Sequence, residues 1–383
     1  MKNSLVFLLL VFAQLSMGQV ANEYLTLDKK MNKIPDSLTT TTSGIAGFIG
    51  SNFKTETEKI RAVFYWTAAN ISYDVPNRNE PNYLDAPEVK IANALKSRKG
   101  VCIHYAEIFN DIANKAGIKT YIIPGYTKQA GKVDAISHAW CASRVDGKWF
   151  LFDPTWGSGY VNGKTFTKKL NNAYFKVEPK KLITSHMPFD YLWQFLNSPW
   201  TNQEFYDGKE DVKKAKVNFD YQTEIEAYEK LSEGDKAFQA AARIQKNGLK
   251  NNLISEEYDS LKKQFTALNQ NKNVEKLNVT IANYNEAISF LNDFVMYRFK
   301  KFKPTVADDE LKNMLQNIKD RFTKCKNDIY EVGSVGEENK GLLFNLKSNI
   351  NLNMIEVEKQ ETFLKEYLSK GLIGRKIMLA SQR

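Results

Sequence analysis

The chain has 383 residues, of which 43% are hydrophobic and 26% are charged. This is the composition of a globular protein long enough for two or three domains, so it excludes wholesale disorder, a collagen-like repeat and a disulfide framework. The net charge of +10 is spread along the chain, without a basic cluster or an aromatic and basic recognition motif. We therefore do not expect a nucleic-acid partner.

The first residues have the pattern of an export signal. Lys2 precedes nine apolar residues, and Ser16 and Gly18 supply small side chains three residues and one residue before the expected cut. The apolar run is too short to remain as a membrane span, and no cysteine follows the cut to carry a lipid anchor. We expect residues 1–18 to be a signal peptide cleaved near Gly18, and the protein to be exported, either periplasmic or secreted.

Between the signal and about residue 157 the apolar pattern predicts helices followed by strands. Residues 19–55 are a lead-in, and residues 56–70 carry apolar side chains at helical spacing. A second helix is predicted over 100–117, with Gly117 at its C-cap. The period then changes to that of strands, and Asp146-Gly147 is the strongest short-range signal for a tight hairpin. The expected strands are 120–124, 137–145 and 148–153.

From about residue 215 the strand pattern disappears and the chain becomes rich in Lys, Glu and Asn with a helical period. Apolar residues recur at alternating steps of four and three between 277 and 295, Pro304 ends that helix, and a similar stripe that includes Cys325 runs over 311–329. No longer repeat is visible, so a solenoid is not favoured. We predict an all-α bundle or short antiparallel coiled coil over 215–383, with Cys325 in its core.

The three cysteines are too few, and odd in number, for a disulfide scaffold. Cys102 falls in the first turn of the predicted helix, where unpaired N–H groups and the helix dipole favour a thiolate. Such a residue is either a reactive nucleophile or a small side chain buried at a helix start. The position of Cys102 alone does not distinguish these two interpretations.

The predicted hairpin brings two further side chains together. If Asp146-Gly147 form a two-residue turn, Asp153 lies opposite Trp140, and His138 shares their face of the sheet. His138 and Asp153 then become diagonal neighbours, close enough for their side chains to meet. An imidazole whose one nitrogen is held by a carboxylate can take a proton from a nucleophile with the other. Separately, His138 could be a core histidine and Asp153 a turn residue, but their convergence favours a Cys-His-Asp triad.

A zinc site is the rival interpretation, because Cys102 with His104 and His138 with Cys141 form two Cys/His pairs. His104 lies on the far side of the helix from Cys102, and Cys141 points to the opposite face of its strand from His138. Since zinc needs converging ligands, we expect neither a metal nor another cofactor. Cys141 is predicted to be a packing residue.

Three blocks carry a resemblance to a known family: IRAVFYWTAANISYD, RKGVCIHYAEIFNDIANKAGIKT and SHAWCASRVDGKWFLFDPTWG. They resemble the transglutaminase-like superfamily, whose papain-like fold packs a Cys-bearing helix on an antiparallel sheet that carries His and Asp. The resemblance covers about residues 56–157. It implies that Cys102 is the nucleophile, His138 the general base and Asp153 the orienting acid. The predicted fold class is α+β, a papain-like core followed by the all-α region.

A fourth block, AYFKVEPKKLITSHMPFDYLWQFLNSP, is similar to the extension of the kyphoscoliosis-peptidase and cytokinesis-protein branch of that superfamily. We assign residues 158–214 to this extension and interpret His186 within it as structural. The flanking regions are predicted to be helical, whereas the calcium-dependent crosslinking members have flanking β-domains. Calcium and protein crosslinking are therefore not expected.

These features predict an exported thiol enzyme that cleaves or transfers acyl groups at peptide or glutamine-type amides through a thioester. Its expected partners are a protein or peptide substrate, a cell-envelope component among them, with the helical region as a surface for a protein partner. The alternative is a non-catalytic scaffold that keeps the fold for protein binding. A binder of nucleic acid or envelope polymer that relies on net charge is the least favoured class.

Overall fold

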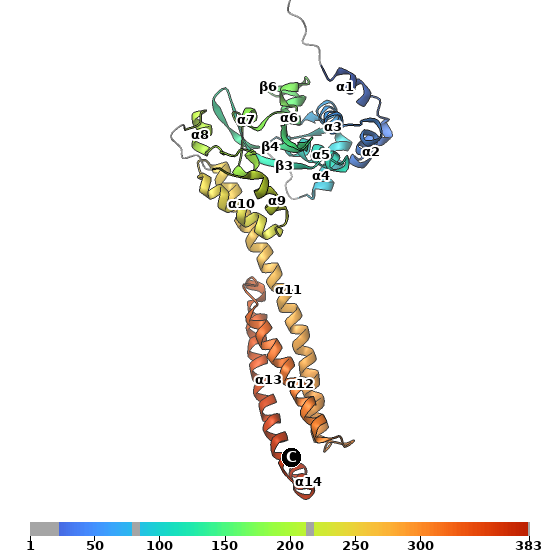
Figure 1. Ribbon diagram of the computed structural model, residues 1–383, viewed down its shortest axis with the longest axis vertical. Coiled ribbons are helices and arrows are strands. Elements are labelled where there is room, and N and C mark those ends of the chain that lie inside the picture. The colour runs from blue at the N-terminus through green and yellow to red at the C-terminus, as the bar shows by residue number, and fades with distance from the viewer. Residues whose placement is uncertain (1–22, 79–84, 212–217, 382–383) are drawn as a thin grey trace, which may run out of the picture. The chain divides into compact units, whose positions relative to one another are not determined.

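The computed structural model describes residues 23–78, 85–211 and 218–381 (Figure 1). The predicted signal peptide, residues 1–18, lies outside the described residues. The chain divides into two compact units. The first unit holds the residues up to Lys230 together with Gln239–Asp259, and the second holds Leu231–Phe238 and Ser260–Arg383.

The first unit begins with helices that surround the cysteine-bearing helix α5. Helix α3 covers the predicted residues 56–70 and starts at a capping box formed by Thr55 and Glu58. Arg61 of α3 is fully buried and donates two hydrogen bonds to Asp28, at 2.7 and 2.8 Å, which ties the first helix to the third. The helices are α1 (Leu25–Met31), α2 (Thr42–Asn52), α3 (Glu56–Asn70), α4 (Pro87–Ser97) and α5 (Cys102–Lys115), with a 3₁₀ turn η1 (Asp36–Thr40).

A four-stranded antiparallel sheet forms the centre of the unit, in the order β5-β4-β3-β8. The predicted hairpin is confirmed: Asp146 and Gly147 have φ of 51° and 77°, as a two-residue turn of this kind requires, and Val145 pairs with Lys148. Figure 1 shows α2 to α5 gathered beside β3 and β4. The strands are β3 (Thr120–Gln129), β4 (Lys132–Val145), β5 (Lys148–Phe152) and β8 (His186–Pro188).

Two details of the sheet differ from the sequence prediction. Strand β3 extends to Gln129 and β4 begins at Lys132, because the backbones of the two strands remain paired up to their connecting turn. The sequence does not predict this extension, because the added residues lack an alternation of apolar and polar side chains. The β4–β5 ladder ends at Cys141 and Phe152, so the expected pairing of Trp140 with Asp153 does not form. Asp153 instead becomes the N-cap of α6 (Pro154–Ser158), since Pro154 has no N–H to continue the ladder.

Alternation along the strands gives the sheet two buried faces. Cys141 and Phe152 pack against α5 and the other helices, whereas Trp140 and Leu151 belong to a second cluster that includes Leu192. Cys141 is fully buried, and its thiol donates to Ala106 O at 3.4 Å, which supports the packing role predicted for it.

The predicted extension supplies the outer strand of the sheet and its surroundings. Strand β8 pairs with β3 through three residues, His186, Met187 and Pro188. The other elements of this region, which include a β6–β7 hairpin, are β6 (Gly159–Asn162), β7 (Thr165–Lys168), η2 (Asn172–Tyr174), α7 (Pro179–Leu182), η3 (Tyr191–Gln194), α8 (Asn202–Asp207) and α9 (Tyr221–Glu229). A short parallel pair, β1 (Ser72–Tyr73) with β2 (Lys99–Gly100), lies just before α5.

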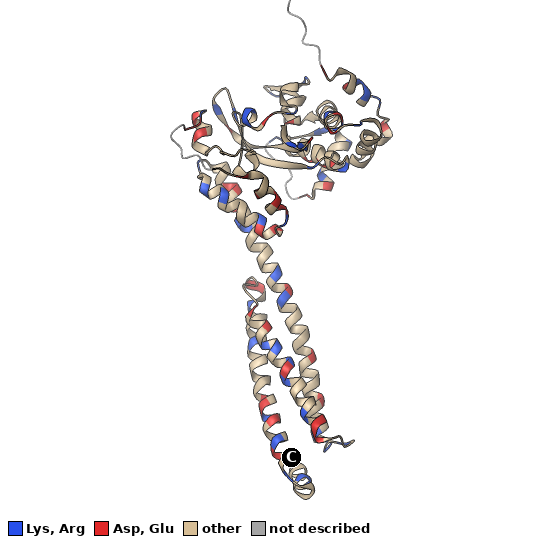
Figure 2. Cartoon of the chain, in the orientation of Figure 1, with Lys and Arg blue, Asp and Glu red and all other residues tan. Residues whose placement is uncertain are grey.

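The second unit is helical, and together with the α+β core it gives the fold class predicted from the sequence. All six apolar residues of the stripe predicted over 311–329 are buried, and Cys325 is 1% exposed; they are Leu311, Leu315, Ile318, Phe322, Cys325 and Ile329. Acidic and basic residues are interspersed along these helices (Figure 2). None of the helices in the described part of the chain could span a membrane. The helices that contribute to this unit are α10 (Glu233–Asn247), α11 (Asn252–Phe299), α12 (Asp308–Tyr330), α13 (Glu337–Ser369) and α14 (Leu372–Ala380).

Candidate active site

Cys102 is the first residue of α5, immediately after the extended N-cap residue Val101. The backbone before it is tightly packed: a Cβ on Gly100 would lie 2.6 Å from the side chain of His104. The Nδ1 atom of His104 accepts a hydrogen bond from Val101 N at 3.1 Å, so this histidine closes the start of the helix. Cys102 is half-buried and faces an open cleft.

His138 and Asp153 meet as the sequence predicts, although by a different route. The Nε2 atom of His138 lies 2.8 Å from Oδ2 of Asp153. The other carboxylate oxygen, Oδ1, accepts hydrogen bonds from the backbone N–H groups of Thr155 and Trp156 at 2.8 and 3.0 Å. The acid is therefore held by the start of α6 rather than by the hairpin ladder.

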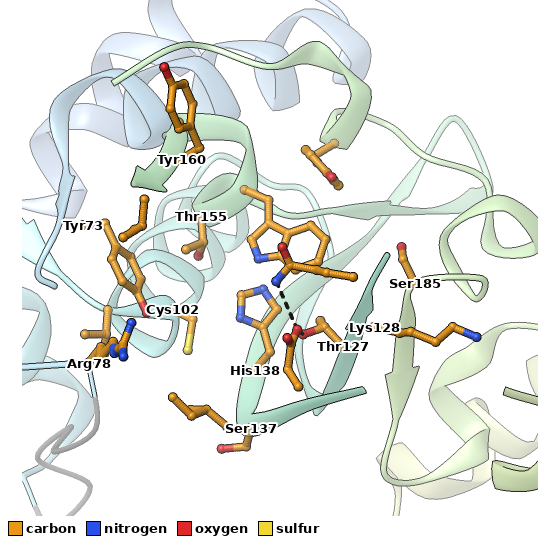
Figure 3. A pocket seen from close by; sticks show the side chains of 18 of the residues that line it. Tyr73, Arg78, Cys102, Thr127, Lys128, Ser137, His138, Thr155, Tyr160 and Ser185 are labelled. Carbon is orange, nitrogen blue, oxygen red and sulfur yellow. Dashed lines mark hydrogen bonds between the residues drawn. The ribbon is translucent and has the colours of Figure 1, made fainter. Parts of the chain in front are cut away.

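The thiol of Cys102 lies beside the imidazole of His138 (Figure 3). Because Nε2 of His138 is occupied by Asp153, Nδ1 is the nitrogen left to face the thiol. The structure thus places the three residues predicted as a triad, Cys102, His138 and Asp153, in one site.

A second imidazole, that of His186, contacts the same acid, although the sequence predicts only a structural role for it. The Nε2 atom of His186 lies 3.0 Å from Oδ2 of Asp153, and its Nδ1 lies 2.8 Å from Oγ of Ser185. The ring is 1% exposed and packs against Trp140 and Trp156, with centroid separations of 5.2 and 4.6 Å. No spacing rule in the sequence signals this contact, because it depends on the pairing of β8 with β3.

Trp140 and Trp66 are core residues. Trp140 is fully buried, and its ring stacks on that of His138 at a centroid separation of 6.1 Å. This contact restricts the orientation of the His138 ring. Trp66 is 1% exposed within the helical core.

The charges in the site stabilise one another. Burial alone lowers the pKa of His138, but the charge of Asp153 and its hydrogen bond outweigh burial, and with a contribution from Cys102 they raise the pKa of His138. Burial would raise the pKa of Asp153, yet His138 and then His186 hold that pKa well below its usual range. The pKa of His186 is lowered, first by burial and also by the charge on His138. The arrangement therefore favours a charged His138, an ionised Asp153 and a neutral His186.

Three donor atoms of this site, on His138, Asp153 and His186, lie within 4.8 Å of one another. Groups of this composition bind cations in many proteins, but here both Nε2 atoms are directed at the same oxygen of Asp153. The Cys/His pairs considered for zinc are separated, since His104 caps α5 and Cys141 packs in the core. The two histidines and Asp153 are hydrogen-bonded to one another, and this arrangement fits a proton-transfer site better than a metal centre.

The cleft beside Cys102 has a volume of about 1190 Å³. It is open along one side and lined by both polar and aromatic side chains, several of which Figure 3 shows around the thiol. The aromatic side chains of its wall are Tyr73, Trp156, Tyr160, Phe166 and Tyr174.

The fold and the site define a class of protein: a papain-like α+β domain with a cysteine at a helix start and a histidine–aspartate pair on its sheet. Residues 45–154 match the family model of the transglutaminase-like superfamily, and the chain contains a domain of that superfamily. The resemblance identified in the sequence is thereby confirmed.

Relatives with this domain include kyphoscoliosis peptidase of Homo sapiens, 34% identical over 159 residues that cover 39% of this chain and 24% of that protein. Hillarin of Drosophila melanogaster is 25% identical over 173 residues, covering 39% of this chain and 20% of that protein. The matches thus span about a quarter or less of these relatives' own length. A solved structure of a TGase shares 20% identity, covers 37% of this chain and 34% of its own, and superposes with a TM-score of 0.22. At that score, the family placement rests on the sequence matches.

Proposed function

We propose that the first unit is an exported thiol enzyme that cleaves or transfers acyl groups at peptide or glutamine-type amides. The observation that carries this proposal is the convergence of three residues distant in the chain: Cys102 and His138 line one open cleft, and the buried Asp153 holds His138 from behind. Nucleophile, base and orienting acid in this relation are the parts that acyl transfer requires.

The chemistry follows from the positions of the groups. Transfer of the Cys102 proton to Nδ1 of His138 produces the charged imidazole that the site favours, and the thiolate attacks the carbonyl carbon of the amide. The C–N bond then breaks as His138 returns the proton to the leaving amine, which leaves a thioester on Cys102. Water, or a second amine, attacks the thioester after giving a proton to His138, and the thiol is regenerated. The backbone N–H of Cys102 at the start of α5 is the proposed donor to the oxyanion.

The cleft favours a chain-like substrate. Its volume of about 1190 Å³ exceeds the ~300–1,000 Å³ of common small-molecule pockets, and it is open rather than enclosed. Aromatic walls beside the thiol suit the side chains of an extended peptide. A protein, a peptide or a peptide of the cell envelope is therefore the proposed substrate class, and export by the residue 1–18 signal is part of the same proposal.

Selective alkylation of the Cys102 thiol tests the enzyme proposal. The intact protein is treated with iodoacetamide at neutral pH, and the modified cysteines are identified by mass spectrometry. We expect Cys102 to be labelled, whereas Cys141 and Cys325, buried and with pKa values raised by burial, are labelled only after unfolding. Cys102→Ala should remove both the native label and any amidase activity on glutamine-containing peptides.

The non-catalytic alternative predicts a different result. If Cys102 in the folded protein reacts no faster than free glutathione, the thiol is not activated and the scaffold function is supported. If the thiol is fast but no acyl group is ever trapped from peptides, the substrate class is wrong while the reactive site stands.

A further inference from the structure

The second histidine of the site comes from outside the residues that match the family model. That match ends at residue 154, whereas His186 begins β8 in the extension. Strand β8 joins the sheet through the pairs Thr127 with His186, Tyr126 with Met187 and Gly125 with Pro188. The short edge strand therefore carries a side chain from the extension to the centre of the site.

The Asp153 carboxylate has no exposure to solvent, and protein donors surround both of its oxygens. Oδ1 accepts two backbone N–H groups, and Oδ2 accepts from His138 and His186. Water is excluded, so these donors replace the hydration that an ionised carboxylate loses on burial. His186 is the only one of the four that neither belongs to the start of α6 nor takes part in the proposed proton transfer.

The tautomer of His186 follows from its two neighbours. An ionised carboxylate only accepts hydrogen bonds, so Nε2 of His186 must carry the proton that meets Oδ2. In the neutral ring, Nδ1 is then an acceptor, and the Ser185 hydroxyl at 2.8 Å supplies its proton. The titratable groups around the ring are Asp153, His138, Asp134 and Tyr174.

We propose that His186 is a positioning residue: as a neutral donor fixed by Ser185, it holds Asp153 ionised and aimed at His138, and so maintains the reactivity of Cys102. The inference rests on the proposed thiol chemistry and assigns a role to the extension, whose strand β8 completes the site. A histidine that only filled the core would not need to direct its N–H at the oxygen already bound by the base.

Two substitutions separate the donor from the packing. His186→Gln keeps an N–H near the place of Nε2, whereas His186→Met fills the space without a donor. The rate of Cys102 alkylation by iodoacetamide is measured on the full chain from about pH 5 to about pH 9, alongside thermal unfolding. We expect His186→Met to slow alkylation at about pH 6 by at least about tenfold and to move the rise of the rate to higher pH. His186→Gln should keep the wild-type profile within about threefold.

Ser185→Ala gives a test that does not disturb the core, because Ser185 is only half-buried. Without the Ser185 hydroxyl, the proton of His186 is no longer fixed on Nε2. Alkylation of Cys102 at about pH 6 should therefore be slower than in wild type, by a smaller factor than in His186→Met. This variant decides the matter if His186→Met does not fold. Its outcome supports the proposal if the profile moves and contradicts it if the profile matches wild type.

The outcomes distinguish the two proposals. A reactive wild-type Cys102 with an unchanged pH profile in folded His186→Met overturns the positioning role and leaves the enzyme proposal intact. Equal losses in the Gln and Met variants, together with lower melting temperatures, would show that His186 acts through packing alone. A wild-type Cys102 no faster than glutathione overturns the enzyme proposal and the positioning role with it.

Discussion

Gly125 lies directly opposite His138 in the β3–β4 register, and no side chain fits at its position. A Cβ on Gly125 would come within 2.3 Å of the Met187 carbonyl oxygen and 2.5 Å of the Trp140 ring. The space is taken by β8 on one side and by the tryptophan beneath the base on the other. The close approach that brings His186 to Asp153 therefore depends on a glycine at position 125.

Gly125→Ala is expected to displace β8 and lower the free energy of unfolding of the first unit by about 1–3 kcal/mol, because backbone atoms must move to admit the methyl group. The rate of Cys102 alkylation should fall with it. Urea unfolding measures the first effect. Gly47→Ala is the matched control, since a Cβ at Gly47 in α2 meets nothing within 4 Å and should be neutral or stabilising. Equal stability of the Gly125 variant and wild type would show that the β3–β8 contact has room for a methyl group at position 125.

Removing the base should slow the thiol. His138→Gln is expected to reduce alkylation of Cys102 at neutral pH by at least about tenfold, a difference of about 1.4 kcal/mol, because the thiol loses the imidazole that takes its proton. His104→Gln is the control: it changes a histidine of the same helix, and glutamine can cap the helix start as His104 does. Rates that fall equally in both variants would indicate a damaged helix rather than a lost base.

The buried, neutral state of His186 predicts a pH dependence of stability. Since burial lowers the pKa of His186 in the folded protein, the unfolded chain binds the extra proton first as the pH falls below about 6.5. The wild-type free energy of unfolding should therefore drop relative to that of His186→Gln between about pH 7 and about pH 5, by up to about 1.4 kcal/mol per pH unit. Chemical unfolding at several pH values checks this. A difference independent of pH would mean that folded His186 takes up its proton as readily as the unfolded chain.

A buried ion pair should contribute strongly to holding the 239–259 segment against the rest of the first unit. Arg243 donates to both oxygens of Asp190 at 2.8–3.0 Å, and the two residues are 9% and 5% exposed. Arg243→Met leaves a buried carboxylate without its partner and is expected to cost about 3–5 kcal/mol of stability.

The exposed pair of Asp111 with Lys115 supplies a comparison for that variant. Asp111→Asn should change stability by less than about 1 kcal/mol in the same urea titration, because solvent screens the pair. Similar small effects for both substitutions would show that the buried pair contributes no more than a surface one.

Local sequence patterns were sufficient to predict the helices and turns whose formation depends on neighbouring residues. The apolar pattern over 100–117 predicts a helix with Cys102 in its first turn, and Asp146-Gly147 predicts the hairpin that follows. The stripe over 311–329 predicts the buried side of α12. In each case a helical or strand period, or the φ preference of a turn, acts over a few neighbouring residues.

Tertiary structure alone decided how the acid is held and what else touches it. Asp153 leaves the ladder at Pro154 and is fixed by the start of α6, and His186 reaches it on a strand of three residues that has too short a pattern to be recognised. That strand exists because β3 offers it backbone partners and Gly125 leaves room for it. Hydrogen bonds between distant segments depend on the assembled sheet, and no local period encodes them.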